Sequence, residues 1–325
     1  MIPYSFLDLS MVSDGDNIPN TLKNSVTTAQ LAEKVGFYRY WFAEHHNMES
    51  ITSSATSVLI GHVASQTHTM RIGSGGVMLP NHSPLVIAEH YGTLASLYND
   101  RIDLGLGRAP GTDQLTAHAL NPNFFQNVRD FPENVQLLQR YLSKDNQHSK
   151  VRAFPGEGTN VPIWILGSST DSAYLASSLG LPYAFASHFA PAQIKPAFDI
   201  YTNNCRTNGF QAKKMAAVNV IMGETNEKAE RIATTLYSMF LGLVRNTRGY
   251  LPAPVDVMDW TPIEEAKVKQ ITSCSFIGNK EKVKTEISAF IKEFDLDEII
   301  ITSPIYHLED KLYTIEKFAE VMKEL

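Results

Sequence analysis

Polar side chains cluster where short apolar segments of the sequence end, and the densest group is Glu44, His45, His46 and Asn47 after the segment YRYWFA. Because side chains alternate along an extended strand, His45 is expected to face the opposite way from Glu44 and His46. One histidine is therefore expected to act alone in a pocket. Adjacent histidines that diverge are poorly placed to share a metal ion, and the chain has no HExxH spacing, so we expect no metal site. A histidine that only stabilises local structure through hydrogen bonds is the alternative.

A second group is rich in glycine and lies in the segment MRIGSGGVM, where Gly73, Ser74, Gly75 and Gly76 precede Val77. Glycine weakens the interior of a strand but is tolerated where a ligand or another backbone comes very close. A flat ring lying against the end of the strand would require such bare backbone. The alternative interpretation is a β-bulge.

A third group has the composition of a phosphate-binding site, because glycine and hydroxyl side chains lie between the segment VPIWILG and a helical pattern that begins near Ala173. Free backbone N–H groups and hydroxyls at the start of a helix bind anions well. Arg108, which ends the preceding apolar segment, would add a fixed positive charge. Simple capping of the helix by serine is the alternative. The candidate residues are Gly167, Ser168, Ser169 and Ser172.

Short apolar segments alternate with longer helical patterns along the chain, which is typical of βα units and a parallel sheet. The helical patterns at 21–36 and 173–180 each end at a glycine, Gly36 and Gly180, as many helices do. Eight regular units favour a closed (β/α)8 TIM barrel of the α/β class over an open Rossmann-type sheet. The expected strands are residues 4–10, 38–45, 70–78, 101–108, 161–168, 182–188, 216–223 and 297–303.

Two stretches interrupt this alternation. Residues 109–123 are expected to form a long loop after the fourth strand. Residues 244–275 contain three prolines and a tryptophan in a weakly periodic pattern, and are expected to form an insertion before the last βα unit. Such an excursion often serves as a lid over a site, and a surface elaboration or dimer contact is the alternative. Because no linker separates domains, residues 1–325 are expected to form a single domain.

The composition excludes several classes of function. With 43% hydrophobic and 19% charged residues, the chain resembles a folded enzyme rather than a disordered protein. A formal net charge of -6, with lysine and arginine scattered, argues against nucleic-acid binding. Cys205 and Cys274 fit neither a disulfide framework nor a zinc spacing. No segment reaches the ~20 apolar residues of a membrane span, and no leader is apparent. We therefore expect a cytoplasmic protein with no membrane partner.

Taken together and in order, these motifs resemble those of the bacterial luciferase-like flavin-dependent monooxygenases. The similar segments are AEHHN, IGSGGVMLPNHSPLVIAEH, DLGLGRAPG and WILGSSTDSAYLASSLGLP, with IGNKEKVKTEISAFIKEFDLDEIIITS as the closing unit. The resemblance covers about residues 4 to 320. Within the family, the chain is most similar to small stand-alone members of unassigned substrate.

The resemblance implies a barrel that binds reduced FMN and O2 and forms a flavin C4a-hydroperoxide, which oxidises a small organic substrate. It implies that His45 is the catalytic histidine and that a non-proline cis peptide joins Gly75 and Gly76 against the flavin ring. The same resemblance places Arg108, Ser168, Ser169 and Ser172 around the FMN phosphate.

The chain also departs from the family pattern. Gly107 stands where luciferase has a reactive cysteine, so light emission is not implied. Ser168 replaces an acidic residue of luciferase, so the phosphate contacts are expected to differ in detail. His82 lies one residue earlier than the family histidine, which weakens the case for a role of His82.

Because the chain carries no NAD-binding signature, the reduced FMN is expected to come from a separate NAD(P)H:flavin reductase. Two alternatives stay open. One is a reductase or dehydrogenase that uses the deazaflavin F420, and the other is a flavin-binding protein without catalysis. Barrel relatives of this family are usually dimers, so a homodimer is expected.

Overall fold

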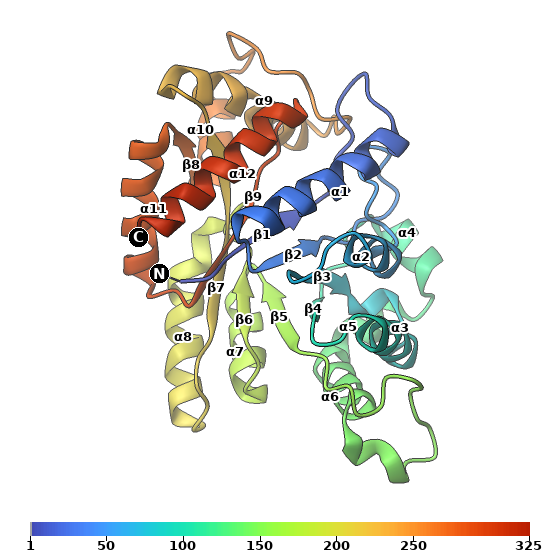
Figure 1. Cartoon of the computed structure of the whole chain (residues 1–325). Coiled ribbons are helices and arrows are strands. Elements are labelled where there is room, and N and C mark those ends of the chain that lie inside the picture. The colour runs from blue at the N-terminus through green and yellow to red at the C-terminus, as the bar shows by residue number, and fades with distance from the viewer. Residues whose placement is uncertain (1) are drawn as a thin grey trace.

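Eight parallel strands pair edge to edge until the first strand meets the last, which closes a barrel. In the computed structural model, which describes residues 2–325, β1 pairs with β2, the pairing continues in chain order to β7, and β9 lies between β7 and β1. Helices surround these strands (Figure 1). The predicted (β/α)8 barrel is therefore confirmed, and the open Rossmann-type alternative is wrong.

The strands are β1 (Tyr4–Asp8), β2 (Arg39–Phe42), β3 (Arg71–Met78), β4 (Ile102–Gly107), β5 (Ile163–Gly167), β6 (Tyr183–Phe185), β7 (Lys214–Met222), β8 (Ser275–Gly278) and β9 (Glu298–Thr302). The α-helices are α1 (Ile18–Val35), α2 (Thr56–Ala64), α3 (Pro84–Leu97), α4 (Gln114–Leu120), α5 (Phe124–Arg129), α6 (Phe131–Leu142), α7 (Thr170–Leu179), α8 (Ile194–Thr207), α9 (Asn226–Arg245), α10 (Pro262–Ile271), α11 (Lys280–Phe294) and α12 (Leu308–Lys323). Short 3-10 helices are η1 (Leu79–Asn81), η2 (Lys144–His148) and η3 (Pro191–Gln193).

The strand β8 was not predicted, and it lies outside the closed ring. It pairs only with the carboxyl half of β7, from Asn219 to Met222, whereas β9 pairs with the amino half. Four residues of mixed polarity directly after a helical segment carry little strand signal, which is why the sequence pattern missed them.

Local capping explains where the predicted helices begin and end. Asn17 accepts a hydrogen bond from the backbone N–H of Asn20 and so caps α1, which ends at Gly36 with a φ of 101°. The helix α7 also ends at its predicted glycine, Gly180, but it begins at Thr170 rather than near Ala173.

The two interrupting stretches are more ordered than predicted. Within 109–123, the loop prediction is wrong for α4, because Asp113 accepts a hydrogen bond from the N–H of Thr116 and starts a helix. Within 244–275, a capping box of Thr261 and Glu264 starts α10, and Leu251 forms a bridge to Ser13 beside the barrel. The lid role of this stretch remains a prediction.

The interior of the barrel is filled in its middle by two tryptophans. Trp41 of β2 and Trp164 of β5 meet edge to face, with ring centroids 5.6 Å apart. The side chains around them are small or aliphatic, among them Ala43, Ala184 and Ala217. Because alanine fills so little space, the interior above the tryptophans stays open towards the carboxyl ends of the strands.

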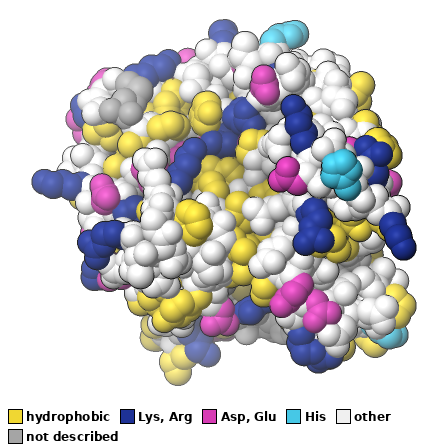
Figure 2. All heavy atoms as spheres, turned by 90° about the horizontal axis from the view of Figure 1, so that it is seen from below, with side chains coloured by type: hydrophobic (Ala, Val, Ile, Leu, Met, Phe, Trp, Pro, Cys, Tyr) yellow, Lys and Arg dark blue, Asp and Glu magenta, His cyan; other side chains and the backbone are white. Residues whose placement is uncertain are grey.

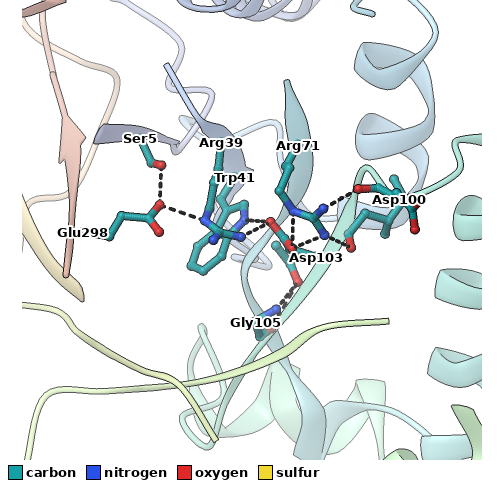
Figure 3. Close-up of polar contacts among 10 residues, drawn as sticks. Ser5, Arg39, Trp41, Arg71, Asp100, Asp103, Gly105 and Glu298 are labelled. Carbon is teal, nitrogen blue, oxygen red and sulfur yellow. Dashed lines mark hydrogen bonds and ion pairs between the residues drawn. The ribbon is translucent and has the colours of Figure 1, made fainter. Parts of the chain in front are cut away.

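A buried ion network closes the opposite, amino end of the barrel (Figure 3). Arg39 contacts Asp103 at 2.6 Å and Glu298 at 2.7 Å, and Arg71 contacts the other oxygen of Asp103 at 2.7 Å. Ser5 donates a hydrogen bond to Glu298 at 2.6 Å. Burial would lower the pKa of Arg39, but the carboxylates of Asp103 and Glu298 raise it overall, so the guanidinium stays charged.

The outer surface mixes charges of both signs. On the face seen in Figure 2, hydrophobic side chains gather near the centre, with lysine and arginine around them and acidic side chains interspersed. Among residues 2–325, no helix combines the length and the apolar character needed to cross a lipid bilayer.

Candidate active site

A cavity of about 1850 Å³ opens at the carboxyl ends of the barrel strands. Its walls include every residue that the sequence analysis selected, namely His45, Gly75, Gly76, Arg108, Gly167, Ser168, Ser169 and Ser172. The carboxyl ends of parallel strands meet at one face of a barrel, which is why residues so distant in sequence converge here. The structure thus brings the candidates together, while the role of each stays a prediction.

His45 follows the end of β2 and lines the cavity, whereas Glu44 does not line it. His46 lines the cavity as well while its Nε2 atom donates to Glu44, so the pocket holds both histidines rather than His45 alone. The Nδ1 atom of His45 is buried and has no hydrogen-bond partner among residues 2–325. Burial lowers the pKa of His45 to about 4, which Glu44 opposes and the charges of His46 and Arg248 reinforce. The imidazole is therefore neutral near pH 7 and suited to accept a proton or share a hydrogen bond.

Glu44 is a buried carboxylate at the centre of a hydrogen-bonded cluster beside the cavity. Its Oε1 atom receives hydrogen bonds from Nε2 of His46 at 2.9 Å and from Nε2 of His82 at 2.8 Å. Burial alone would raise the pKa of Glu44, but these two hydrogen bonds lower it to about 2. His82, for which the sequence analysis found little support, therefore helps to hold the end of β2 in position through its hydrogen bond to Glu44.

Replacing Glu44 with glutamine is expected to lower the free energy of unfolding at pH 7 by about 1–3 kcal/mol, because hydrogen bonds to a buried charge are lost. A pKa that is depressed in the folded state stabilises the protein above the ordinary pKa near 4.5, and this contribution is lost as the pH falls towards 2. The difference between wild type and variant should therefore shrink in urea unfolding at pH 3. Glu49→Gln, on an exposed side chain of the same rim, is the control.

The same cluster has the composition of a metal site, since ligand atoms of Glu44, His46 and His82 lie within 4.8 Å of one another. The sequence argument against a metal considered only the adjacent pair of histidines and missed that His82 supplies a second imidazole. In the structure, however, one carboxylate oxygen already accepts from both imidazoles, and Asn81 donates to it at 3.4 Å. These hydrogen bonds satisfy the carboxylate without an ion, and the absence of a metal remains a prediction.

Gly75 and Gly76 form the wall of the cavity along β3, and a cis peptide bond joins them, as the resemblance implied. The register between β3 and β4 shifts between Ser74 and Val77, so the irregularity expected of a bulge is present as well. A Cβ atom on Gly76 would lie 2.6 Å from the carbonyl oxygen of Gly105. The backbone of the neighbouring strand, and not only a ligand, therefore requires glycine here.

We expect Gly76→Ala to be more destabilising than Gly75→Ala. The new methyl group at residue 76 would meet backbone that cannot yield, whereas at residue 75 its nearest neighbour, 2.7 Å away, is the end of the flexible Leu7 side chain. Overpacking of this kind costs about 1–3 kcal/mol. The midpoints of urea unfolding of the two variants give the comparison, and equal midpoints would contradict this explanation of Gly76.

The candidate phosphate site lies where β5 joins α7. Ser169 occupies the cap position of α7 but makes no side-chain capping bond, so the capping alternative does not account for it. The Ser172 hydroxyl points inward, donating to the carbonyl of Ser169 at 2.8 Å, and is therefore less available to a ligand. Arg108 forms an ion pair with Asp171 at 3.1 Å, and both side chains are exposed. Exposed pairs contribute about 0–1 kcal/mol, so an anion could displace Asp171 at little cost.

Sequence reasoning missed His188 in the cavity wall, although it follows β6 and satisfies the rule that polar residues ending apolar strands deserve attention.

The stretch after α9 was expected as an insertion that could cover a site, and its Arg248, Tyr250 and Met258 line the cavity. The sequence pattern did not identify these particular residues, because their position depends on long-range packing.

Comparison with known protein families shows the family to which the chain belongs. The sequence profile described as luciferase-like monooxygenase matches residues 4–292. The chain belongs to this family. It is 44% identical over 328 residues to a luciferase-like monooxygenase of Escherichia coli (strain K12), covering 100% of this chain and 98% of that protein. It is 49% identical over 324 residues to protein YvbT of Bacillus subtilis (strain 168), covering 98% and 96%.

A relative with a more specific name is the N-acetyl-S-alkylcysteine monooxygenase of Bacillus subtilis (strain 168), with 30% identity over 336 residues, covering 99% of this chain and 98% of that protein. Together with the family profile, it supports an oxidoreductase.

Solved structures agree on the fold. Apo-MsnO8 superposes with a TM-score of 0.91 at 27% identity, covering 99% of both chains. The oxygenating constituent of 3,6-diketocamphane monooxygenase from Pseudomonas putida, in complex with FMN, gives a TM-score of 0.74 at 15% identity, covering 98% of this chain and 97% of that chain. An F420-dependent secondary alcohol dehydrogenase gives 0.72 at 15% identity, covering 98% of both chains. At such low identity the last two show the fold alone.

Proposed function

We propose that the protein is an FMN-dependent monooxygenase that receives reduced FMN from a separate NAD(P)H:flavin reductase and oxidises a small organic substrate with O2. The observation that carries this proposal is the convergence of His45, the Gly75–Gly76 backbone, Arg108 and the Ser168–Ser169 hydroxyls on one cavity. Structural neighbours in complex with FMN or with an F420 adduct support a flavin-type cofactor.

The cavity suits FMN in both size and chemistry. Binding sites for small molecules usually measure about 300–1000 Å³. A cavity of about 1850 Å³ therefore offers room for a cofactor together with a substrate. Leu7, Trp41 and Ala217 form an apolar floor on which an isoalloxazine ring could lie. Arg108, Ser168 and Ser169 would hold the phosphate at the edge, where α7 begins. The side chain of Ser169 does not cap this helix, although the N–H of Thr170 donates to Gln193 at 3.2 Å.

Reduced FMN, when bound, would supply the two electrons that activate oxygen, so that one oxygen atom enters the substrate and the other leaves as water. The residues of this chain would orient the ring, exclude bulk water and control a proton. His45 is neutral near pH 7 and lines the cavity, so its imidazole would hold or accept that proton.

The phosphate site can be tested by comparing FMN with riboflavin, which lacks the phosphate. Arg108→Met is expected to weaken FMN binding by about tenfold or more, because a charge-assisted contact is lost, and to leave riboflavin binding unchanged. Flavin fluorescence titration measures both affinities, with Arg152→Met at a distant exposed ion pair as the control. Equal weakening of both ligands would place the phosphate elsewhere.

Turnover is tested by mixing the protein and reduced FMN with oxygenated buffer and following flavin absorbance by stopped flow. We expect a transient species that free FMN does not show, and an oxidation rate that differs from the rate in free solution. Oxidation at the free-solution rate, at protein concentrations that bind all the flavin, would overturn the proposal.

Two other functions give different outcomes in the same assays. A reductase or dehydrogenase using F420 is favoured by one structural neighbour, and titration with both cofactors separates it from the FMN enzyme. A flavin-binding protein without catalysis would bind FMN but show no dependence of oxidation on His45. The reductase partner, the homodimer and the cytoplasmic location remain predictions, and sedimentation velocity tests the dimer.

A further inference from the structure

Besides His45 and His46 after β2, a further histidine, His188, lies in the wall of the cavity. It follows β6, whereas His45 follows β2. Three strands separate β2 from β6 in either direction around the ring, so the two residues come from opposite sides of the barrel. Both line the same cavity, and a molecule bound over the barrel axis would therefore lie between them.

Both histidines have a buried ring nitrogen without a partner. The Nδ1 atoms of His45 and His188 are two of six buried side-chain polar atoms that lack a hydrogen bond within residues 2–325. A buried polar atom left unpaired costs about 1–3 kcal/mol, so such atoms call for an explanation. These Nδ1 atoms are too deeply buried to reach the cavity, so the part of each ring that can meet a bound molecule is the edge that carries Nε2. Two imidazoles that line one cavity from opposite sides have a common role if both of these edges contact the same molecule.

The backbone at His188 is held in place by hydrogen bonds to β7. Asn219, which is buried, donates to the carbonyl of His188 at 2.7 Å and to the Ser275 hydroxyl of β8 at 3.0 Å. Ser187 donates to the carbonyl of Ala217 at 2.6 Å. The extra strand β8 thus helps to fix the backbone that carries His188, and a side chain on a well-held backbone is suited to contact a ligand in a defined geometry.

The charges of the two histidines are linked. Burial lowers the pKa of His188 to about 4, the proximity of His45 lowers it further, and a polar contact of the ring with the backbone of Ala217, which does not reach hydrogen-bond geometry, opposes this shift. Both rings are therefore neutral near pH 7, mainly because they are buried. A neutral imidazole has one N–H donor and one lone pair, so each ring can act as either donor or acceptor.

We propose that His188 is a further catalytic residue, which together with His45 contacts the reacting group from the two sides of the cavity. The inference rests on the proposed function, since it assigns a second residue to that same site. One imidazole would donate a hydrogen bond from its N–H to a bound oxygen atom, while the lone pair of the other accepts a hydrogen bond from the bound molecule. No proton leaves either ring, so both imidazoles stay neutral.

The first test observes the two rings directly. Full-length protein with 13Cε1-labelled histidine is titrated with oxidised FMN, and the His45 and His188 signals are assigned from His45→Gln and His188→Phe variants. We expect FMN to shift both signals and to leave the exposed His148 unchanged. A His45 signal that moves while the His188 signal stays would overturn the role of His188.

The second test separates catalysis from structure. His188→Phe keeps the ring shape without hydrogen-bonding groups, and His188→Gln keeps such a group. We expect both variants to bind FMN within about threefold of wild type, while His188→Phe changes the rate of reduced-FMN oxidation by about 10–100-fold and His188→Gln recovers part of it. A rate in His188→Phe equal to wild type, with FMN bound, would overturn the inference.

The two hypotheses fail in different ways. If wild-type protein binds no FMN in the fluorescence titration, the proposed function fails first. If FMN binds, His45 responds and oxidation is altered relative to free flavin, the proposed function stands and only the results for His188 decide the further inference.

Discussion

Replacing His45 with alanine is expected to lower the rate of reduced-FMN oxidation in the protein by about 10²–10⁴-fold, while the affinity for FMN changes by less than about threefold. The reason is geometric. The proposed phosphate site lies on other strands, and the side chains of the apolar floor, Leu7, Trp41 and Ala217, are not altered by the change, whereas the imidazole is the neutral base nearest the end of β2. Stopped-flow absorbance and fluorescence titration measure the two quantities.

The pH dependence gives an independent check on the same residue. Because burial lowers the pKa of His45 to about 4, the neutral form is present throughout pH 5.5–8 and the rate should not fall in that range on account of this group. The rate should fall only as the pH drops towards 4 and the ring gains a proton. This acid limb should be absent from the residual activity of His45→Ala.

His148→Ala, on the exposed side of η2, is the matched control and should behave as wild type. If His45→Ala and His148→Ala oxidise reduced FMN equally fast, the chemistry lies elsewhere in the cavity or the protein only carries flavin.

Much of this site could be predicted because it obeys local rules. Each selected residue ends an apolar segment or begins a helix, and parallel strands bring such ends to one face of a barrel. Gly167 illustrates the strength of the rule, since a Cβ there would lie 1.8 Å from the Ser172 hydroxyl. The tight junction of β5 and α7 thus requires glycine at residue 167.

The remaining features depend on contacts between distant segments, which no local pattern records. His82 joins Glu44 only because the segment after β3 packs against the end of β2. His188 is held by Asn219 and Ser275, which lie 31 and 87 residues further along the chain. The short strand β8 was missed for the same reason, because its pairing with β7 and not its composition makes it a strand.

The polar groups at the two ends of the barrel differ in how completely they are paired with other protein groups. At the carboxyl end, the polar groups His45, His188 and Ser169 are left partly unpaired, which is costly for stability but leaves them free for a ligand. At the amino end, Arg39 and Asp103 satisfy each other within a closed network. The difference supports the proposal that the first group serves binding, while the second group holds the fold together.

The amino-end network therefore predicts the largest loss of stability. Asp103→Asn preserves the size of the side chain but leaves Arg39 and Arg71 with one carboxylate fewer in a buried site. Because Glu298 forms its ion pair with Arg39 and not with Arg71, the guanidinium of Arg71 would lose its only ion-pair partner among residues 2–325. Removing one member of a buried ion pair costs about 3–5 kcal/mol, and we expect this loss in the free energy of unfolding measured with urea.

Asp256→Asn is the matched control, because Asp256 pairs with Arg231 at 2.6 Å on the surface, the same distance as Asp103 and Arg39. The exposed pair should contribute less than about 1 kcal/mol, since water and salt screen it. The contrast tests burial rather than distance as the source of the effect. If both substitutions cost less than about 1 kcal/mol, solvent reaches the barrel base and the ion network does not hold the strands together.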